Sequence, residues 1–86
     1  MSEPLNVPIA TIPKNSREEI RVQLSEFKGT RFADVRIFAE FAAAMGKRSP
    51  TAKGVTIPLD RLSAFVRAVT DAEAHARSLG LIGGEA

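Results

Sequence analysis

Residues 19–27 alternate between apolar and polar side chains along most of their length. The apolar positions are Ile20, Val22 and Leu24. The polar positions are Arg21, Gln23 and Ser25, and Phe27 shares their parity. Successive side chains of a β-strand point to opposite faces of a sheet, so this alternation predicts a half-buried strand.

The segment from Thr30 to about Phe41 also alternates, but its second face is aromatic and charged at the same time. We expect its core face to consist of Ala33, Val35, Ile37, Ala39 and Phe41. The opposite face carries Phe32, Asp34, Arg36 and Phe38. The two strands are joined by a short turn in which Gly29 can adopt a positive φ. They should therefore form an antiparallel hairpin with their two non-core faces side by side.

The rest of the chain predicts two short strands and a C-terminal helix. The strands are expected at residues 9–13 and 54–59, with a basic loop over residues 42–54. A helical period then begins at Leu59, and Gly80 suits the end of the helix. Its apolar stripe comprises Leu62, Phe65, Val66, Val69, Ala72, Ala76 and Leu79. Strands followed by one helix indicate an α+β fold in which the helix covers one face of the sheet.

Composition excludes several kinds of site. The 86 residues suffice for one small domain, and there is no cysteine for a disulfide or a thiolate metal site. His75 is the only histidine, and no clustered residues could build a catalytic set. We therefore expect neither an enzyme nor a cofactor or metal. No signal peptide or membrane span is apparent, which favours a cytoplasmic location.

Positive charge is concentrated in the middle of the chain. Residues 14–53 hold nine lysines and arginines against five aspartates and glutamates, although the net charge of the whole chain is only +2. This distribution favours a surface that binds polyanions. The hairpin face adds what single-stranded nucleic acid requires, because aromatic rings stack on bases and basic groups follow phosphates. That face contains Phe27, Phe32 and Phe38 with Arg21 and Arg36, and Lys47, Arg48 and Lys53 extend its rim. Alternatively, the phenylalanines form a second core under the N-terminal arm or a partner subunit.

The segments SEFKGTRFADVRIF and KRSPTAKGVTIPLDRL together resemble the C-terminal domain of the Positive Cofactor Four transcriptional coactivators. The shared pattern is an aromatic-Lys-Gly turn, an Asp-hydrophobic-Arg strand, and then Pro, Lys-Gly, a short strand and an amphipathic helix. The resemblance covers about residues 9–79. It implies a curved four-stranded antiparallel sheet followed by one helix, a homodimer, and binding of single-stranded or melted DNA. By position it also implies base stacking on Phe27 and basic contacts from Lys28, Arg36 and Lys53, with Lys14 as a further match.

These observations together predict a homodimeric, sequence-nonspecific single-stranded-DNA-binding protein that acts in transcription, in a nucleoid-associated location. Residues 1–8 are expected to form an arm, residues 9–80 the domain and residues 81–86 a tail. The expected nucleic-acid contacts are Lys14, Arg21, Phe27, Lys28, Arg31, Arg36, Phe38, Lys47, Arg48 and Lys53, and the expected dimer contacts are Phe65, Val69, Glu73, Ala76 and Leu79. Asp34 is expected to orient Arg36, and Phe32 is assigned neither to the ligand nor to the partner subunit. The partners are single-stranded DNA, a second copy and the transcription machinery, with no membrane. RNA binding and a protein-interaction module using the phenylalanine face remain alternatives.

Overall fold

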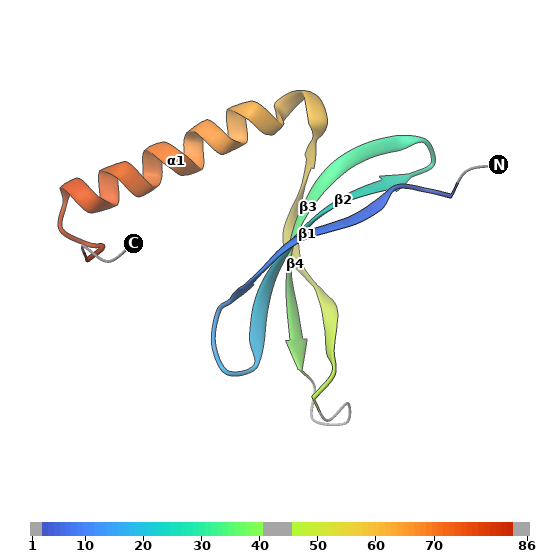
Figure 1. Ribbon diagram of the computed structural model, residues 1–86, viewed down its shortest axis with the longest axis horizontal. Coiled ribbons are helices and arrows are strands. Elements are labelled where there is room, and N and C mark those ends of the chain that lie inside the picture. Colours follow the sequence, from blue (N-terminus) through green and yellow to red (C-terminus); the bar gives the residue numbers. More distant parts are fainter. Residues whose placement is uncertain (1–2, 41–45, 84–86) are drawn as a thin grey trace.

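Four antiparallel strands in the order of the chain form an open sheet that is followed by one helix (Figure 1). A computed structural model of the chain describes residues 3–40 and 46–83. The strands are β1 (Asn6–Pro13), β2 (Glu18–Phe27), β3 (Thr30–Glu40) and β4 (Arg48–Pro58). A 3-10 turn, η2 (Leu59–Arg61), leads into the helix α1 (Leu62–Ser78). The predicted α+β architecture is confirmed.

The register of the strands separates two faces as the alternation predicts. In the β2–β3 pair, Val22 lies opposite Val35 and Arg21 lies opposite Arg36. The apolar face consists of Ile20, Val22, Leu24, Ala33, Val35 and Ile37, and Ile57 of β4 joins it opposite Ala33. The charged face consists of Glu19, Arg21, Gln23, Phe32, Asp34, Arg36 and Phe38. Cross-strand neighbours on the apolar face are therefore all apolar, and a shift of one residue would expose them, which fixes the register of the hairpin.

The β2–β3 hairpin closes through two residues, Lys28 and Gly29. Phe27 pairs with Thr30, and the φ angles of the two turn residues are 51° and 81°. Positive φ at both central residues is the type I′ arrangement, whose twist matches that of the flanking strands. The predicted tight turn is confirmed, but it also holds Lys28 in a left-handed conformation that is uncommon for a residue with a side chain.

Both outer strands are longer than their sequence patterns indicate. β1 begins at Asn6 instead of residue 9, and β4 begins at Arg48, inside the segment expected to be a loop. The reason in β4 is an irregularity: Arg36 pairs with Gly54 but Phe38 pairs with Pro50, so three residues of β4 oppose one of β3. Such a bulge breaks the alternation from which a strand is recognised. Phe41 and residues 42–45 lie outside the described residues.

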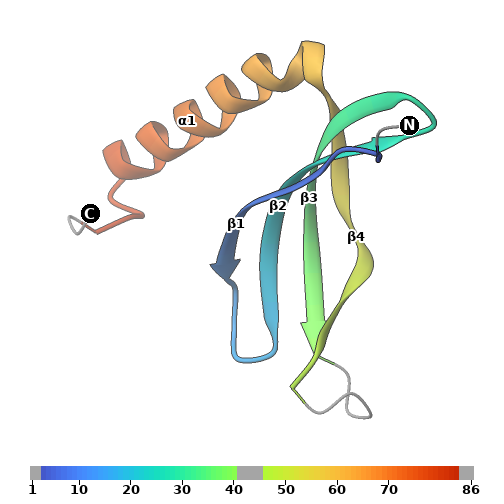
Figure 2. The same cartoon turned by 45° about the vertical axis from the view of Figure 1, so that its right-hand side comes forward.

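The helix does not cover the sheet, and that prediction is wrong for the single chain. α1 leaves the end of β4 and extends away from the strands in both views (Figures 1 and 2). Only the start of the helical segment meets the sheet, and no residue of α1 is fully buried. The apolar stripe that periodicity identifies therefore makes few contacts with the sheet of the same chain. The helix ends as expected, because Gly80 has a φ of 75° and Leu81 N–H donates to the Ala76 carbonyl. Within the described residues, no helix is both long and apolar enough to cross a membrane.

Candidate nucleic-acid interface

Asp34 anchors the centre of the charged face and is almost fully buried, with 8% of its surface exposed. Arg36 donates to it twice, through Nε and Nη2, each at 3.0 Å, and Thr56 Oγ1 donates at 3.3 Å. The remaining guanidinium nitrogen, Nη1, donates to the Thr51 carbonyl at 3.0 Å. Hydrogen bonding to Asp34 raises the pKa of Arg36 above its ordinary value. The expected role of Asp34 in orienting Arg36 is confirmed by this bidentate pair.

Glu19 forms a second carboxylate centre on the same face, 9% exposed and opposite Phe38 in the register. It accepts a hydrogen bond from Arg21 Nε of its own strand and one from Arg48 Nη1 of β4 at 2.7 Å. Arg48 Nη2 also donates to the Ser16 carbonyl at 2.9 Å. The hydrogen bond from Arg21 has the largest effect on Glu19 and lowers its pKa below the ordinary value. The hydrogen bond from Arg48 lowers this pKa further, whereas burial acts in the opposite direction. One carboxylate therefore fixes two arginines from different strands.

The aromatic residues of this face differ in how open they are to a ligand. The guanidinium carbon of Arg21 lies 4.1 Å from the ring centroid of Phe38, which is cation–π stacking distance. Phe27 at the end of β2 is 65% exposed, and Lys28 Nζ lies 5.3 Å from its ring centroid. Phe32 is half-buried between Ser25 and Pro58 in the register. Phe27 and Lys28 thus form an exposed aromatic–cationic tip, whereas Phe38 is covered on one side by Arg21.

The structure brings some of the expected contact residues together and separates others. Arg21, Arg36, Phe38 and Arg48 share the charged face, with Phe27 and Lys28 at its hairpin end. Arg31 has the parity of Ala33, lies opposite Glu26 and pairs with it at 3.4 Å, which puts it on the apolar side. Lys14 pairs with Glu18 at 3.3 Å. The hydrogen bond from Asn15 lowers the pKa of Glu18 most, the hydrogen bond from Lys14 comes next, and the charge of Lys53 makes a smaller contribution in the same direction. Lys47 is exposed directly before β4.

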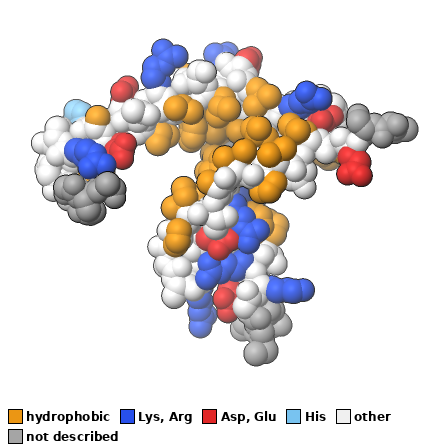
Figure 3. Space-filling view, in the orientation of Figure 1, with side chains coloured by type: hydrophobic (Ala, Val, Ile, Leu, Met, Phe, Trp, Pro, Cys, Tyr) orange, Lys and Arg blue, Asp and Glu red, His pale blue; other side chains and the backbone are white. Residues whose placement is uncertain are grey.

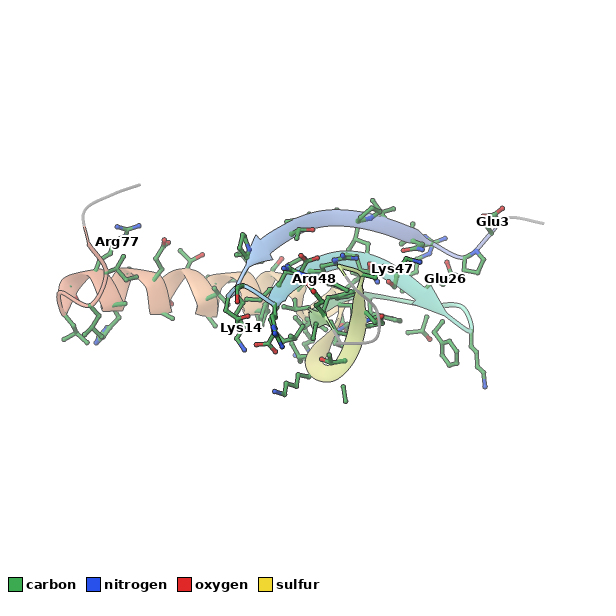
Figure 4. The ribbon with its side chains drawn as sticks, turned by 90° about the horizontal axis from the view of Figure 1, so that it is seen from below. Glu3, Lys14, Glu26, Lys47, Arg48 and Arg77 are labelled. Atoms are coloured by element: carbon green, nitrogen blue, oxygen red, sulfur yellow. The ribbon has the colours of Figure 1, made fainter. Side chains whose placement is uncertain are left out.

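The expected dimer contacts lie along the unpacked helix. Val69 and Leu79 are 51% and 63% exposed, and Phe65 and Ala76 are half-buried. Glu73 pairs with Arg77 one turn later at 3.2 Å. Arg77 lies far along the helix from the labelled residues of the sheet (Figure 4). Hydrophobic side chains form a band that runs along the helix and onto the adjoining part of the sheet, while basic and acidic side chains mingle further down the strands (Figure 3).

Two residues of this interface were missed by sequence reasoning. Glu19 shares parity with Arg21 two residues away, a spacing that Asp34 and Arg36 also have, so its role could have been predicted from the sequence. Thr51 had no signal, because the hydrogen bond from its Oγ1 to the Ile37 carbonyl at 2.8 Å and its contact with Arg36 arise inside the bulge. In the described part of the chain, no group of three or more His, Cys, Asp or Glu residues is placed to hold a metal ion.

The arrangement of sheet and helix agrees with comparisons to known proteins. Residues 14–68, more than half of the chain, match the model of the family described as Transcriptional Coactivator p15 (PC4). A PC4 homolog from Burkholderia pseudomallei has a similar fold in its tetragonal crystal form, with a TM-score of 0.71, 25% identity, and coverage of 80% of this chain and 98% of that one. The orthorhombic crystal form of the same homolog has a TM-score of 0.70 and 22% identity, with coverage of 85% of this chain and 96% of that one. No curated protein matches the chain. The chain therefore belongs to the Transcriptional Coactivator p15 (PC4) family.

Proposed function

We propose that this protein binds single-stranded or melted DNA across the charged face of its sheet, as a homodimer that serves transcription. The observation that carries the proposal is the exposed Phe27–Lys28 tip, continuous with a face on which arginines are held in fixed positions. Single-stranded nucleic acid is bound by aromatic groups that stack on bases and by cations that follow the backbone. Family membership supports a role in DNA binding and transcription.

Ion pairing distinguishes the basic residues by how strongly each can attract phosphate. Asp34 offsets the charge of Arg36, and Glu19 offsets part of the charge of Arg21 and Arg48. These arginines retain their planar shape and donor groups but attract phosphate less strongly than unpaired cations do. Lys28 is exposed at the hairpin tip, and Lys47 is exposed at the opposite end of the strands. We therefore assign the main phosphate contacts to these two lysines. Lys14 and Lys53 contribute at longer range, and Arg31 contributes least because it pairs with Glu26 on the apolar side.

The surface area of the chain supports self-association. A single chain exposes 6813 Å². A compact monomer of 9.3 kDa is expected to expose about 5,000 Å². The difference of about 1,800 Å² falls within the roughly 1,000–2,500 Å² that each chain buries in an obligate homodimer. A second chain that covered the apolar face and the helix would remove this excess.

The extended shape of the single chain also supports self-association. The radius of gyration is 15.6 Å, against about 12 Å for a compact domain of this length. The buried hydrophobic residues among those described are only Ala33 and Ile57, which is too small a core to hold a lone domain together. Val66, Val69 and Leu79 are each more than half exposed on the helix. We assign Phe65, Val69, Ala76 and Leu79 to the dimer contact, with Glu73 at its edge.

Titrations of labelled oligonucleotides, followed by fluorescence anisotropy at 50 and 200 mM salt, test the proposal. Single-stranded DNA should bind more tightly than duplex, and its affinity should fall with salt by a log–log slope of about −0.7 per neutralised phosphate. Equal affinity for duplex, or a flat salt dependence, would refute the DNA-binding proposal. Tighter binding of a matched RNA strand would assign the face to RNA, and no binding of any nucleic acid would favour the protein-interaction alternative.

A further inference from the structure

Glu19, Arg21 and Phe38 form a stacked unit on the charged face. Glu19 and Phe38 lie opposite each other on β2 and β3, and Arg21 lies two residues beyond Glu19 on the same side. The hydrogen bond from Arg21 Nε to the Glu19 carboxylate fixes the guanidinium, which lies 4.1 Å from the Phe38 ring centroid. Arg48 Nη1 holds the same carboxylate from β4. The guanidinium therefore covers one face of the Phe38 ring.

We propose that Glu19 is a positioning residue for nucleic-acid binding, which holds Arg21 flat over Phe38 so that a base stacks on the guanidinium plane and not on the ring. The inference rests on the proposed function and deepens it. Arg21 is the accessible member of the unit, since its side chain is 38% exposed and that of Glu19 is 11% exposed. A guanidinium is planar, weakly hydrated and able to stack on π systems, so it can lie between a ring and a base.

The charge of Glu19 makes the proposal easy to distinguish from simple electrostatics. A carboxylate beside a polyanion site repels phosphate, so removal of its charge should tighten binding if charge alone matters. If Glu19 instead sets the orientation of Arg21, its loss should weaken binding, and only for ligands that carry bases. The two explanations therefore predict changes of opposite sign for the same substitution.

The test compares two strands of equal length, one of oligothymidylate and one of base-free deoxyribose phosphate. Glu19→Gln should weaken binding of the thymidylate strand about fivefold or more, the equivalent of the low end of one stacked base. It should leave binding of the base-free strand unchanged or slightly tighter. Arg21→Lys keeps the charge but removes the plane, and should show the same selective loss. Glu26→Gln removes an equal charge that pairs with Arg31 on the apolar side, and serves as the matched control with little effect on either strand.

Each outcome bears on the proposal once circular dichroism has established which variants are folded. Selective loss of the base-bearing strand in Glu19→Gln supports it, and Arg21→Lys supplies the same test if Glu19→Gln does not fold. Unchanged or tighter binding of the thymidylate strand by a folded variant, or equal losses for both strands, overturns the positioning role. Failure of the unmodified protein to bind either strand instead refutes the proposed function itself.

Discussion

Replacement of Lys28 by asparagine separates the stability of the hairpin from its proposed function. Lys28 occupies the left-handed region with a φ of 51°, followed by Gly29 in the same region. A left-handed conformation costs a residue with a side chain about 1–2 kcal/mol, and asparagine tolerates it better than lysine. Asn-Gly is also the favoured pair for a type I′ turn. Lys28→Asn should therefore leave the free energy of unfolding unchanged or raise it by up to about 1 kcal/mol.

The same substitution should weaken binding because it removes the cation of the hairpin tip. Loss of one phosphate contact makes the log–log slope of affinity against salt concentration less steep by about 0.7 for each chain that contacts the DNA. Between 50 and 200 mM salt, one such contact changes affinity by about 2.6-fold. The variant should thus lose most affinity at low salt and approach the unmodified protein at high salt.

Anisotropy titrations at four salt concentrations, together with urea unfolding, measure both effects. Arg31→Gln is the matched control, since it removes a cation three residues away that pairs with Glu26 on the apolar side. Its slope should change less than that of Lys28→Asn. If Lys28→Asn is as stable as the unmodified protein and binds with the same slope, the assignment of Lys28 to phosphate is wrong. If it unfolds more easily, the account of the turn is wrong.

Other perturbations address the remaining parts of the structure. Phe27→Ala should weaken binding of single-stranded DNA by about 1–3 kcal/mol in an anisotropy titration, and unchanged affinity would remove Phe27 from the site. Val69→Glu places a charge in the exposed apolar stripe and should convert the proposed dimer to monomer or unfold it, whereas a persisting dimer in light scattering would contradict the helix contact. Gly54→Ala puts a Cβ 2.9 Å from Arg36 Cα, so the unfolding free energy should fall by about 1–3 kcal/mol. Because folding lowers the pKa of Glu19, its ionised form stabilises the protein above the ordinary glutamate pKa of about 4.3, and this stability should be lost as the pH falls below that value. In urea unfolding from pH 6 to 3, the stability of Glu19→Gln should therefore fall less steeply than that of the unmodified protein.

The strand alternation was sufficient to predict the β2–β3 hairpin and its two faces. Ile20, Val22 and Val35 lie on one face, and Arg21 and Arg36 on the other, as their parity requires. Alternation reports which side chains share a face but not what covers that face. For this reason the sequence could not distinguish a sheet covered by its own helix from one left open in the single chain.

The bulge in β4 limited prediction of the candidate site. Pro50 and Gly54 both face β3, but the irregular stretch between them breaks the period and resembles a loop. The contact between Arg36 and the Thr51 carbonyl depends on that irregularity. Pairings within one strand are simpler, because residues two apart share a face. Asp34 and Arg36 were placed on one face in this way, and the role of Asp34 followed because an unpaired carboxylate would repel phosphate. The same reasoning could have identified the Glu19–Arg21 pair.

Nuclear magnetic resonance can test directly whether the charged face is the nucleic-acid site, because the two faces carry different probes. Side-chain Nε–H signals report on Arg21 and Arg36, and methyl signals report on Val22 and Val35, which lie beside them on the opposite face. On addition of a thymidylate strand, the arginine signals and the Phe27 ring signals should shift while the valine methyl signals stay in place. Shifts of the valine methyl signals with unchanged arginine signals would show that the ligand occupies the apolar face and would contradict the proposed function.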